Sequence, residues 1–447
     1  MFNRAIIDNL KDWAKEKDRK PLVLRGARQT GKTTVVDLFA KDFDQYIYLN
    51  LEKNEQERKL FDESYTIQQI LDAIFYLKNA DKTKRKTLLF IDEIQSSPKA
   101  VETLRYLYED AKHLYVISAG SLLESLIEKT IHFPVGRVDY LPVRPCSFEE
   151  FLAASDQEKN LEIIKGDHVP DYAHDILTEL FWQYTMIGGM PEIIADYIEN
   201  RDLFRLKRIY ESLIISYQDD IEKYARNQKM MNVIRHIIGA AFQYAGSRIT
   251  FEKFGNSTYR SREMGEAFRV LEKTMLLQLI YPVTKTRLPL EIKTKMSPKL
   301  QMLDTGLVNH SSGLQKILIT SKHIDEVYKG KIAEHITGQE LLTLHTSVRS
   351  KLNFWVPKNS NAQSEIDFVY PYNDLLIPVE VKSGATGRLR SLHRFVEESP
   401  HELAVRVYSG KYKVADTTTV KGKKFRLINV PFYMLGQIEN VLKRCID

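Results

Sequence analysis

Two short stretches of the sequence carry residues whose types and spacing could do chemistry. The first, GARQTGKT at residues 26 to 33, follows the spacing G-x-x-x-x-G-K-[ST]. Gly26 and Gly31 would let backbone N–H groups wrap a polyphosphate, which Lys32 would reach with its ammonium. The Thr33 hydroxyl would ligate Mg²⁺. A chance turn is the alternative, but the stretch lies between the strand signal PLVLRG and a helix signal, which is the expected context. The residues predicted to bind ATP here are Gly26, Ala27, Arg28, Gln29, Thr30, Gly31, Lys32, Thr33 and Thr34.

An apolar strand that ends in two acids, LLFIDEIQ, is the expected partner of this loop. Asp92 would join the Mg²⁺ shell, and Glu93 could polarise the water that attacks the γ-phosphate. The alternative is a solvated strand end, although two adjacent acids at a central strand are costly to keep without a cation. The next strand signal, LYVISAGS, ends in Ser118 and Ser121. Either serine could sense the γ-phosphate, and a capping role explains them equally well.

The second stretch is IPVEVKSG, a strand signal that carries an acid and a base. On a strand, Glu380 and Lys382 share one face. Asp367 lies 13 residues before Glu380, and YPYND between them has good turn chemistry, so a hairpin could bring the two carboxylates together. Two carboxylates suit Mg²⁺ or Mn²⁺, and a neighbouring Lys can orient water. The competing interpretation is a plain salt-bridged pair on an exposed strand.

The elements that must position these groups follow from the periodicity. Strands alternate with helices over residues 1–150, which predicts a parallel sheet covered on both faces. Residues 151–228 are helical, interrupted by IGGMP. Two helix signals followed by two strands over 229–315 suit a winged helix-turn-helix. A long helix leads into several strands over 316–447.

Composition narrows the class of protein. A chain of 447 residues is expected to form several domains, and its net charge of +6 permits contact with nucleic acid without requiring it. Cys146 and Cys445 cannot build a disulfide framework, which fits a reducing compartment. Without a signal peptide or a run of about 20 apolar residues, we expect a cytoplasmic protein with no membrane contact.

Several motifs together carry a resemblance to a known family. GARQTGKT, LLFIDEIQ, AGSLLE, FPVGRVDYLPVRPCSFEEFL and GGMPE resemble prokaryotic AAA-type ATPases. The likeness extends through PKLQMLDTGL and GKIAEHITGQELL to SEIDFVYPYNDLLIPVEVKSGATGRLRSLHRF. This combination, which covers nearly the whole chain, is similar to one subfamily, in which an AAA_14-type ATPase module carries an appended domain of unknown function. The resemblance implies an α/β fold of the P-loop AAA+ type with a helical lid, and a homo-oligomer. In a neighbouring subunit Arg137 could act as an arginine finger or could form only a structural ion pair, and Gly188, Gly189 and Pro191 would belong to the lid or simply break a helix.

The second stretch resembles the core of PD-(D/E)xK nucleases, so the C-terminal domain is expected to be of the restriction-endonuclease type. Ile366 stands where that superfamily has Pro. Glu334, on the helix GKIAEHITGQE, occupies the place where the superfamily often adds an acid, and Gln339 and Glu340 are weaker candidates. The resemblance thus implies a metal site of Glu334, Asp367 and Glu380, with Lys382 as a catalytic residue.

Basic residues outside the two stretches bear on the partner. Arg260, Arg262, Arg269 and Lys273 could contact DNA or could form a solvated helix face. Lys421, Lys423, Lys424 and Arg426 suggest a basic hairpin turn.

The leading hypothesis is an ATPase that couples its nucleotide state to binding or cleaving DNA, with a role in defence against mobile DNA suggested by analogy. A second hypothesis is an oligomeric signalling switch with an inactive nuclease-like domain that binds a partner. A peptide-remodelling machine ranks last, because no aromatic pore loop is evident between the phosphate-binding motifs.

Overall fold

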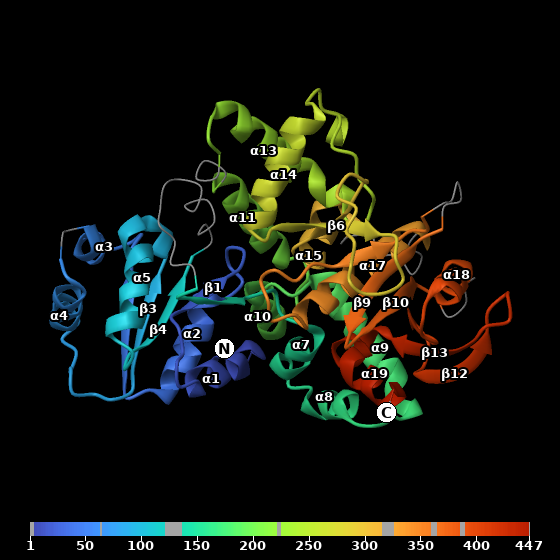
Figure 1. The fold of residues 1–447 in the computed structure, drawn as a ribbon, viewed down its shortest axis with the longest axis horizontal. Coiled ribbons are helices and arrows are strands. Elements are labelled where there is room, and N and C mark those ends of the chain that lie inside the picture. The colour runs from blue at the N-terminus through green and yellow to red at the C-terminus, as the bar shows by residue number, and fades with distance from the viewer. Residues whose placement is uncertain are drawn as a thin grey trace. The chain divides into compact units, whose positions relative to one another are not determined.

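A computed structural model describes residues 4–62, 65–120, 136–220, 225–314, 326–358, 364–384 and 389–446. The chain divides into two compact units. Unit 1 contains Met1–Arg144 with Lys273–Met275 and Thr346–Arg349, and unit 2 contains Pro145–Glu272, Leu276–His345 and Ser350–Asp447. Figure 1 shows the elements of each unit. In the described ranges no helix combines the length and the apolar character that crossing a membrane requires.

Unit 1 is built on a five-stranded sheet whose neighbouring strands are all parallel. Its order is β2 (Gln45–Asn50), β3 (Thr87–Asp92), β4 (Tyr115–Ala119), β1 (Leu22–Arg25) and β5 (Asp139–Pro142). All six residues of β3 are buried, as expected for a central parallel strand that is covered on both faces. The parallel sheet predicted over residues 1–150 is therefore confirmed.

Helices cover both faces of this sheet. They are α1 (Ile6–Lys15), α2 (Lys32–Phe39), α3 (Glu55–Asp62), α4 (Ile67–Leu77) and α5 (Pro98–Asp110). Residues of α1 and α2 belong to one apolar cluster with Leu24 and Phe90, and residues of α4 and α5 belong to a second cluster with Leu89 and Ile91. Alternate residues of β3 thus face opposite clusters, which is the side-chain alternation of a strand. Local signals set the helix starts: Thr66 and Gln69 form a capping box at α4, and Ser97 with Pro98 begins α5.

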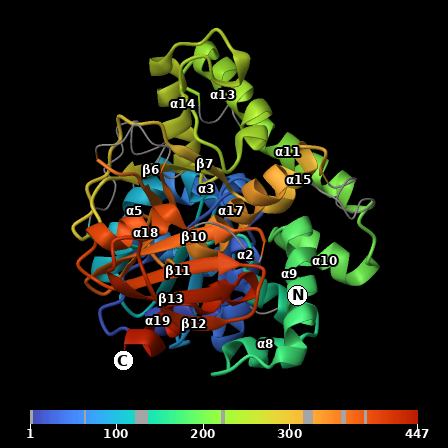
Figure 2. The same ribbon diagram turned by 90° about the vertical axis from the view of Figure 1, so that its right-hand side faces the viewer.

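Unit 2 contains an eight-stranded mixed sheet. Its order is β12 (Lys413–Thr418), β13 (Lys424–Pro431), β11 (Leu403–Tyr408), β10 (Leu375–Lys382), β9 (Ile366–Tyr372), β8 (Asn353–Trp355), β6 (Leu277–Val283) and β7 (Lys299–Met302). Figure 2 shows β10, β11, β13 and β12 in this order. Helix α18 (Arg390–Glu398) packs on the sheet through Leu392, Phe395 and Val396.

The strands expected to form the wing of a separate domain lie in this sheet. β6 and β7 form the predicted antiparallel hairpin, but β6 also pairs in parallel with β8, Tyr281 beside Asn353. The expected boundary between residues 315 and 316 needs correction, because one sheet takes strands from both sides of it. The sequence could not reveal this long-range pairing, since each strand separately satisfies the pattern of a winged helix.

The other α-helices that the structure describes in unit 2 surround this sheet or form a helical layer next to it. They are α7 (Phe148–Ala154), α8 (Glu158–Lys165), α9 (His174–Ile187), α10 (Pro191–Asn200), α11 (Leu206–Asp219), α13 (Gln228–Ala241), α14 (Ser261–Lys273), α15 (Thr305–Ser311), α17 (Glu326–Thr343) and α19 (Ile438–Ile446). Phe181 of α9 stacks on Phe432, with 5.9 Å between the ring centroids, and also meets Phe148. Helix α9 therefore shares a core with the short 3-10 helix Phe432–Gln437 that follows the last strand.

Candidate functional sites

The glycine-rich loop connects β1 to α2, as predicted. A Cβ on Gly26 would lie 2.2 Å from the carbonyl oxygen of Val143, so no larger residue fits there. Gly31 has a φ of 88°, a left-handed conformation that favours glycine, and α2 begins at the next residue. The loop therefore ends at a helix N-terminus, where backbone N–H groups and the helix dipole favour a bound anion.

Lys32 and Thr33 begin helix α2, directly after the loop. The Lys32 ammonium donates hydrogen bonds to the carbonyl oxygens of Gly26 and Ala27, at 2.9 and 2.8 Å, which holds it over the loop. The Thr33 hydroxyl donates to Asp92 Oδ2 at 2.9 Å. A hydroxyl and a carboxylate oxygen thus meet at the carboxyl end of β3, and this pair is chemically suited to Mg²⁺. The two predicted motifs converge on one site.

Tyr48 is a member of this site that was not predicted. Its hydroxyl donates to Asp92 Oδ2 at 3.2 Å and accepts from the Asn50 side-chain amide at 3.0 Å. Tyr48 and Asn50 lie on β2, where Asn50 is in register with Asp92. The sequence signal was available as two polar side chains in the apolar stretch YIYLN, but only the strand pairing places them beside Asp92.

Glu93 follows directly, with a φ of 51°, and its carboxylate accepts a hydrogen bond from the Gln95 amide. Burial raises the pKa of Glu93 above its ordinary value, and the neighbouring Asp92 carboxylate adds to this effect. A raised pKa suits a group that takes a proton from water, because the catalytic pKa works best near the operating pH. The position of Asp92 and the raised pKa of Glu93 are compatible with the predicted metal-binding and basic roles.

Of the two serines, Ser118 lies on the central strand β4, paired with β1 and β3. Its Oγ is buried and has no hydrogen-bond partner in the described part of the chain, so a contact with the γ-phosphate stays a prediction. Ser121 lies outside the described residues.

Arg137 forms an ion pair with Glu109, with 3.1 Å between Nε and Oε1, and its side chain is about half exposed. Arg137 thus forms the structural ion pair that was the alternative to an arginine finger, and its action in a neighbouring subunit stays a prediction.

The second predicted constellation is assembled by the hairpin of β9 and β10. The strands are antiparallel, with Phe368 opposite Val379 and a tight turn at Asn373, so Asp367 and Glu380 lie side by side as predicted. Asp367 Oδ2 accepts a hydrogen bond from the backbone N–H of Val381 at 2.8 Å. The Lys382 ammonium donates to Glu380 Oε1 at 2.6 Å.

Two groups from other elements complete this carboxylate cluster. Glu334 comes from α17, as the nuclease resemblance implied, and Lys299 comes from β7 and was not predicted. The Lys299 ammonium lies 2.7 Å from Glu365 Oε1, 3.0 Å from Glu334 Oε2 and 3.4 Å from Asp367 Oδ1. All four residues of β7 are buried, so a lysine in the apolar run KLQML was a readable signal that acids must surround it.

Burial and mutual repulsion perturb the titration of this cluster. Burial, and then the Asp367 carboxylate, raises the pKa of Glu334 to about 7 and that of Glu380 to about 8. Burial opposes the charged form of Lys299, but the carboxylates of Asp367, Glu334 and Glu365 outweigh it and raise the Lys299 pKa. Carboxylates under such repulsion gain stability from any cation that reaches them.

The fit of a divalent cation to this cluster is partial. Among the described residues, no group of three or more His, Cys, Asp and Glu side chains is placed to hold a metal ion. In this cluster Lys299 binds oxygens of Glu334 and Asp367, and Lys382 binds an oxygen of Glu380. However, Glu380 Oε2 is buried without a hydrogen-bond partner, which is unusual for a carboxylate oxygen. One Glu380 oxygen is therefore open to a cation, whereas the expected set of three carboxylates is not arranged as a metal site.

The two weaker candidates on α17 lie elsewhere. Both Glu340 oxygens accept from the backbone N–H of Phe148, and Oε1 also accepts from the Tyr184 hydroxyl at 2.7 Å. Gln339 binds Thr305 and Tyr184. These residues join α17 to the helical region, so they have a structural role.

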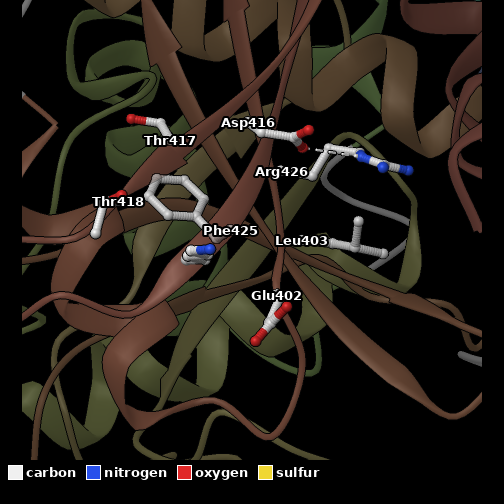
Figure 3. Close-up of a pocket in the computed structure, with 8 residues that line it drawn as sticks. Glu402, Leu403, Asp416, Thr417, Thr418, Phe425 and Arg426 are labelled. Carbon is white, nitrogen blue, oxygen red and sulfur yellow. Dashed lines mark hydrogen bonds and ion pairs between the residues drawn. The ribbon is translucent and has the colours of Figure 1, made fainter.

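Some of the predicted basic residues are exposed, whereas others make contacts within the protein. Arg260, Arg262 and Arg269 are exposed at the start and on the surface of α14. Lys423, by contrast, donates to three carbonyl oxygens at the end of α18. Arg426 pairs with Asp416 at 3.3 Å in a surface hollow of about 520 Å³ over β11, β12 and β13 (Figure 3). The predicted basic hairpin turn thus uses Lys423 and Arg426 for internal contacts, and the hollow is distant in the sheet order from β7.

Comparison with known proteins identifies the class of unit 1. Residues 18–152 match the model of a family described as an AAA domain, and this range contains the glycine-rich loop, Asp92 and Glu93. The chain therefore contains a P-loop ATPase domain of the AAA type. Residues 178–317 and 329–433 match two domains of unknown function, DUF8612 and DUF4143. No curated protein matches the chain.

Solved structures with a similar fold include a Walker-type ATPase of Pyrococcus abyssi, with 13% identity, a TM-score of 0.44, and coverage of 70% of this chain and 96% of that one. The Orc1 protein of Aeropyrum pernix in complex with DNA has 11% identity, a TM-score of 0.27, and coverage of 69% and 90%. The RuvB branch-migration motor of Thermotoga maritima has 15% identity, a TM-score of 0.27, and coverage of 66% and 93%. With TM-scores below 0.5, these likenesses add nothing to the family match.

Proposed function

We propose that this protein hydrolyses ATP and couples its nucleotide state to DNA binding or Mg²⁺-dependent DNA cleavage by unit 2. The observation that carries the proposal is the pairing of Asp367 with Glu380 and Lys382, with Glu380 Oε2 buried and unpartnered. A buried carboxylate oxygen without a donor is stabilised by a cation, and Lys382 adds the positive charge that phosphoryl chemistry requires.

In the ATPase half, Lys32 would neutralise the outer phosphates, and Thr33 with Asp92 would hold Mg²⁺. Glu93 would accept a proton from the attacking water, and Ser118 would contact the γ-phosphate. Residues 151–228, which include helices α8 to α11, would form the lid. Arg137 would complete the site of a neighbouring copy of the chain in a homo-oligomer.

In the nuclease-like half, a Mg²⁺ or Mn²⁺ ion would supply an activated water and polarise the scissile phosphate. Asp367 and Glu380 would hold it. Lys382 would orient the water and offset charge on the transition state, while Glu334 would complete the negative surroundings. Arg260, Arg262 and Arg269 of the winged-helix-like region would contact the DNA backbone. Defence against mobile DNA would suit this pair of activities.

A second candidate function is an ATP-dependent oligomeric switch whose nuclease-like domain only binds a partner. The observation that favours it is Lys299, because its ammonium already occupies the carboxylates of Glu334 and Asp367. An internal cation at this place lowers the need for a metal ion.

A cleavage assay separates the two functions. The full chain, Lys32→Ala and Glu380→Gln would be incubated with radiolabelled single- and double-stranded DNA, with and without ATP, Mg²⁺ and Mn²⁺. Metal-dependent cleavage that is lost in Glu380→Gln supports the proposal, and its dependence on Lys32 reports coupling. Intact ATP hydrolysis without cleavage under any of these conditions would favour the switch.

A further inference from the structure

The Asp92 carboxylate is held at both of its oxygens by groups of the protein itself. Oδ1 accepts a hydrogen bond from the backbone N–H of Glu93 at 3.0 Å. Oδ2 accepts from the Thr33 hydroxyl at 2.9 Å and from the Tyr48 hydroxyl at 3.2 Å. Glu93 and Thr33 belong to the phosphate-binding motifs, whereas Tyr48 lies on the neighbouring strand β2. Tyr48 thus adds a contact that these motifs do not supply.

The direction of the Tyr48 hydroxyl proton is set by Asn50, whose side-chain amide donates to the Tyr48 oxygen at 3.0 Å. The carbonyl oxygen of the Asn50 side chain points elsewhere, because it accepts from the backbone N–H groups of Glu52 and Lys53, at 3.2 and 2.8 Å. A hydroxyl has one proton to donate. Since its oxygen accepts from Asn50, the Tyr48 hydroxyl gives that proton to Asp92.

Asn50 is in turn fixed by buried groups. Its backbone N–H donates to Glu57 Oε2 at 2.6 Å, and both residues are buried. Glu57 Oε1 accepts from the Asn54 side-chain amide at 2.9 Å and from the Lys78 ammonium at 2.5 Å. A buried polar network whose members are paired is rigid. A chain of hydrogen bonds therefore runs from α3 and the end of α4 through β2 to Asp92.

This chain bears on metal binding because it ends on Asp92 Oδ2, the oxygen that meets the Thr33 hydroxyl. These two groups are the ones proposed to hold the Mg²⁺ of bound ATP. Mg²⁺ demands nearly ideal octahedral geometry, so its affinity depends on how well each ligand is oriented. Loss of a group that orients a metal ligand commonly costs about 10- to 100-fold in metal affinity. A carboxylate with donors on both oxygens cannot turn freely, which is the condition that such a site requires.

We infer that Tyr48 is a positioning residue for the metal of bound ATP: its hydroxyl orients the Asp92 carboxylate, and Asn50 directs that hydroxyl. This inference rests on the proposed ATPase function. Because Tyr48 acts through Asp92, it contributes to nucleotide affinity only when the metal is present. A residue that merely stabilised the loop would contribute with and without the metal.

The test measures the Kd of a fluorescent, non-hydrolysable ATP analogue for the full chain, in Mg²⁺ and in EDTA. The ratio of the Kd in EDTA to the Kd in Mg²⁺ reports the coupling between metal and nucleotide. Tyr48→Phe removes a single oxygen atom and should lower this ratio about 10-fold, with the Kd in EDTA unchanged. In an Asp92→Ala background, Tyr48→Phe should have no further effect, because the residue through which it acts is gone.

Tyr46→Phe is the matched control. Tyr46 lies two residues earlier on β2, and its hydroxyl donates to Asp37 at 2.7 Å instead of to Asp92. Its loss removes the same atom from the same strand, so the ratio should equal that of the parent chain.

The outcomes separate the inference from the function on which it rests. An unchanged ratio in Tyr48→Phe, with a lowered ratio in Asp92→Ala, would overturn the inference and leave the proposed function standing. An unchanged ratio in Asp92→Ala would overturn the inference together with the proposed role of Asp92 in holding Mg²⁺. A higher Kd in EDTA for Tyr48→Phe would overturn the inference in favour of a structural role in the loop. An equal effect of Tyr48→Phe with and without Asp92 would likewise overturn it.

Discussion

The Asp304 carboxylate accepts a hydrogen bond from the backbone N–H of Gly189 at 2.5 Å, although 115 residues separate them. Its other oxygen caps α15 by accepting from the Leu307 N–H at 3.0 Å. Burial raises the pKa of Asp304 to about 6. Asp304 lies five residues after Lys299 on the same segment, so the turn between α9 and α10 is joined to the strand that supplies the internal cation of the cluster.

The first prediction concerns Gly188, which has a φ of 75° and would place a Cβ 2.3 Å from Asp304 Oδ1. Gly188→Ala is expected to lower the free energy of unfolding by about 2 kcal/mol or more, because both strain and a clash result. Gly239→Ala is the control, since nothing lies within 4 Å of its Cβ and it is inside helix α13. That change should stabilise by about 0.5–1 kcal/mol. Denaturant titration measures both, and an unchanged midpoint for Gly188→Ala would contradict the structure.

The second prediction concerns Glu93. Glu93→Gln removes the proton acceptor and keeps the shape of the side chain, so kcat for ATP hydrolysis should fall about 100-fold or more while nucleotide binding persists. Lys32→Ala is the contrasting variant, and it should weaken binding itself. Fluorescent-nucleotide titration and phosphate release measure the two quantities. Equal hydrolysis by Glu93→Gln and the parent would remove Glu93 from the proposed mechanism.

The third prediction is a pH dependence from Glu340. Burial raises its pKa to about 8 from an ordinary 4.5, so the protonated carboxyl is the form that the folded state stabilises. This stability is complete below pH 4.5 and is lost as the pH rises through 8, with a slope of at most about 1.4 kcal/mol per pH unit. Glu340→Gln keeps a carbonyl oxygen for Tyr184 and should remove this slope. Unfolding curves of both proteins between pH 5 and 9 test it, and identical slopes would disprove the assignment.

The fourth prediction separates two lysines of the hairpin between β12 and β13. Lys423→Met removes three hydrogen bonds to the carbonyl oxygens of Val396, Ser399 and His401 and should destabilise by about 1–3 kcal/mol. Lys421→Met should change stability by less than about 0.5 kcal/mol, because its side chain is 80% exposed. Thermal melts compare them. A loss of DNA binding in Lys423→Met at unchanged stability would instead give this lysine a role in contacting phosphate.

The fifth prediction tests Arg137 in trans. Arg137→Ala should lower ATP hydrolysis about 1,000-fold, and mixing it with the Lys32→Ala chain should restore part of the activity, because each chain supplies what the other lacks. Glu109→Gln breaks the ion pair of Arg137 but keeps the guanidinium, so this control should remain active. Full activity of Arg137→Ala alone would leave Arg137 with its structural ion pair only.

Sequence reasoning succeeded where the determinants are local. The loop from Gly26 to Thr33, the acids after β3 and the hairpin that joins Asp367 to Glu380 each depend on residues close together in the chain. It failed for Lys299, because no local pattern links β7 to β9 or to α17. A long separation in sequence also explains why the role of Glu340 was not predicted, because Glu340 binds Phe148, which lies 192 residues away.

The pairing of β6 with β8 has a consequence for how the chain can be divided. A fragment that begins at residue 316 would lose β6 and β7, so the outer edge of β8 would present unpaired backbone groups to solvent. It would also lack Lys299, which leaves Glu334 and Asp367 without their ammonium. Such a fragment should self-associate through the exposed edge. During synthesis, β6 and β7 are also made before β8, which pairs with β6. The edge of β6 therefore stays unpaired until β8 has been made. The complete sheet can form only late in the synthesis of this protein.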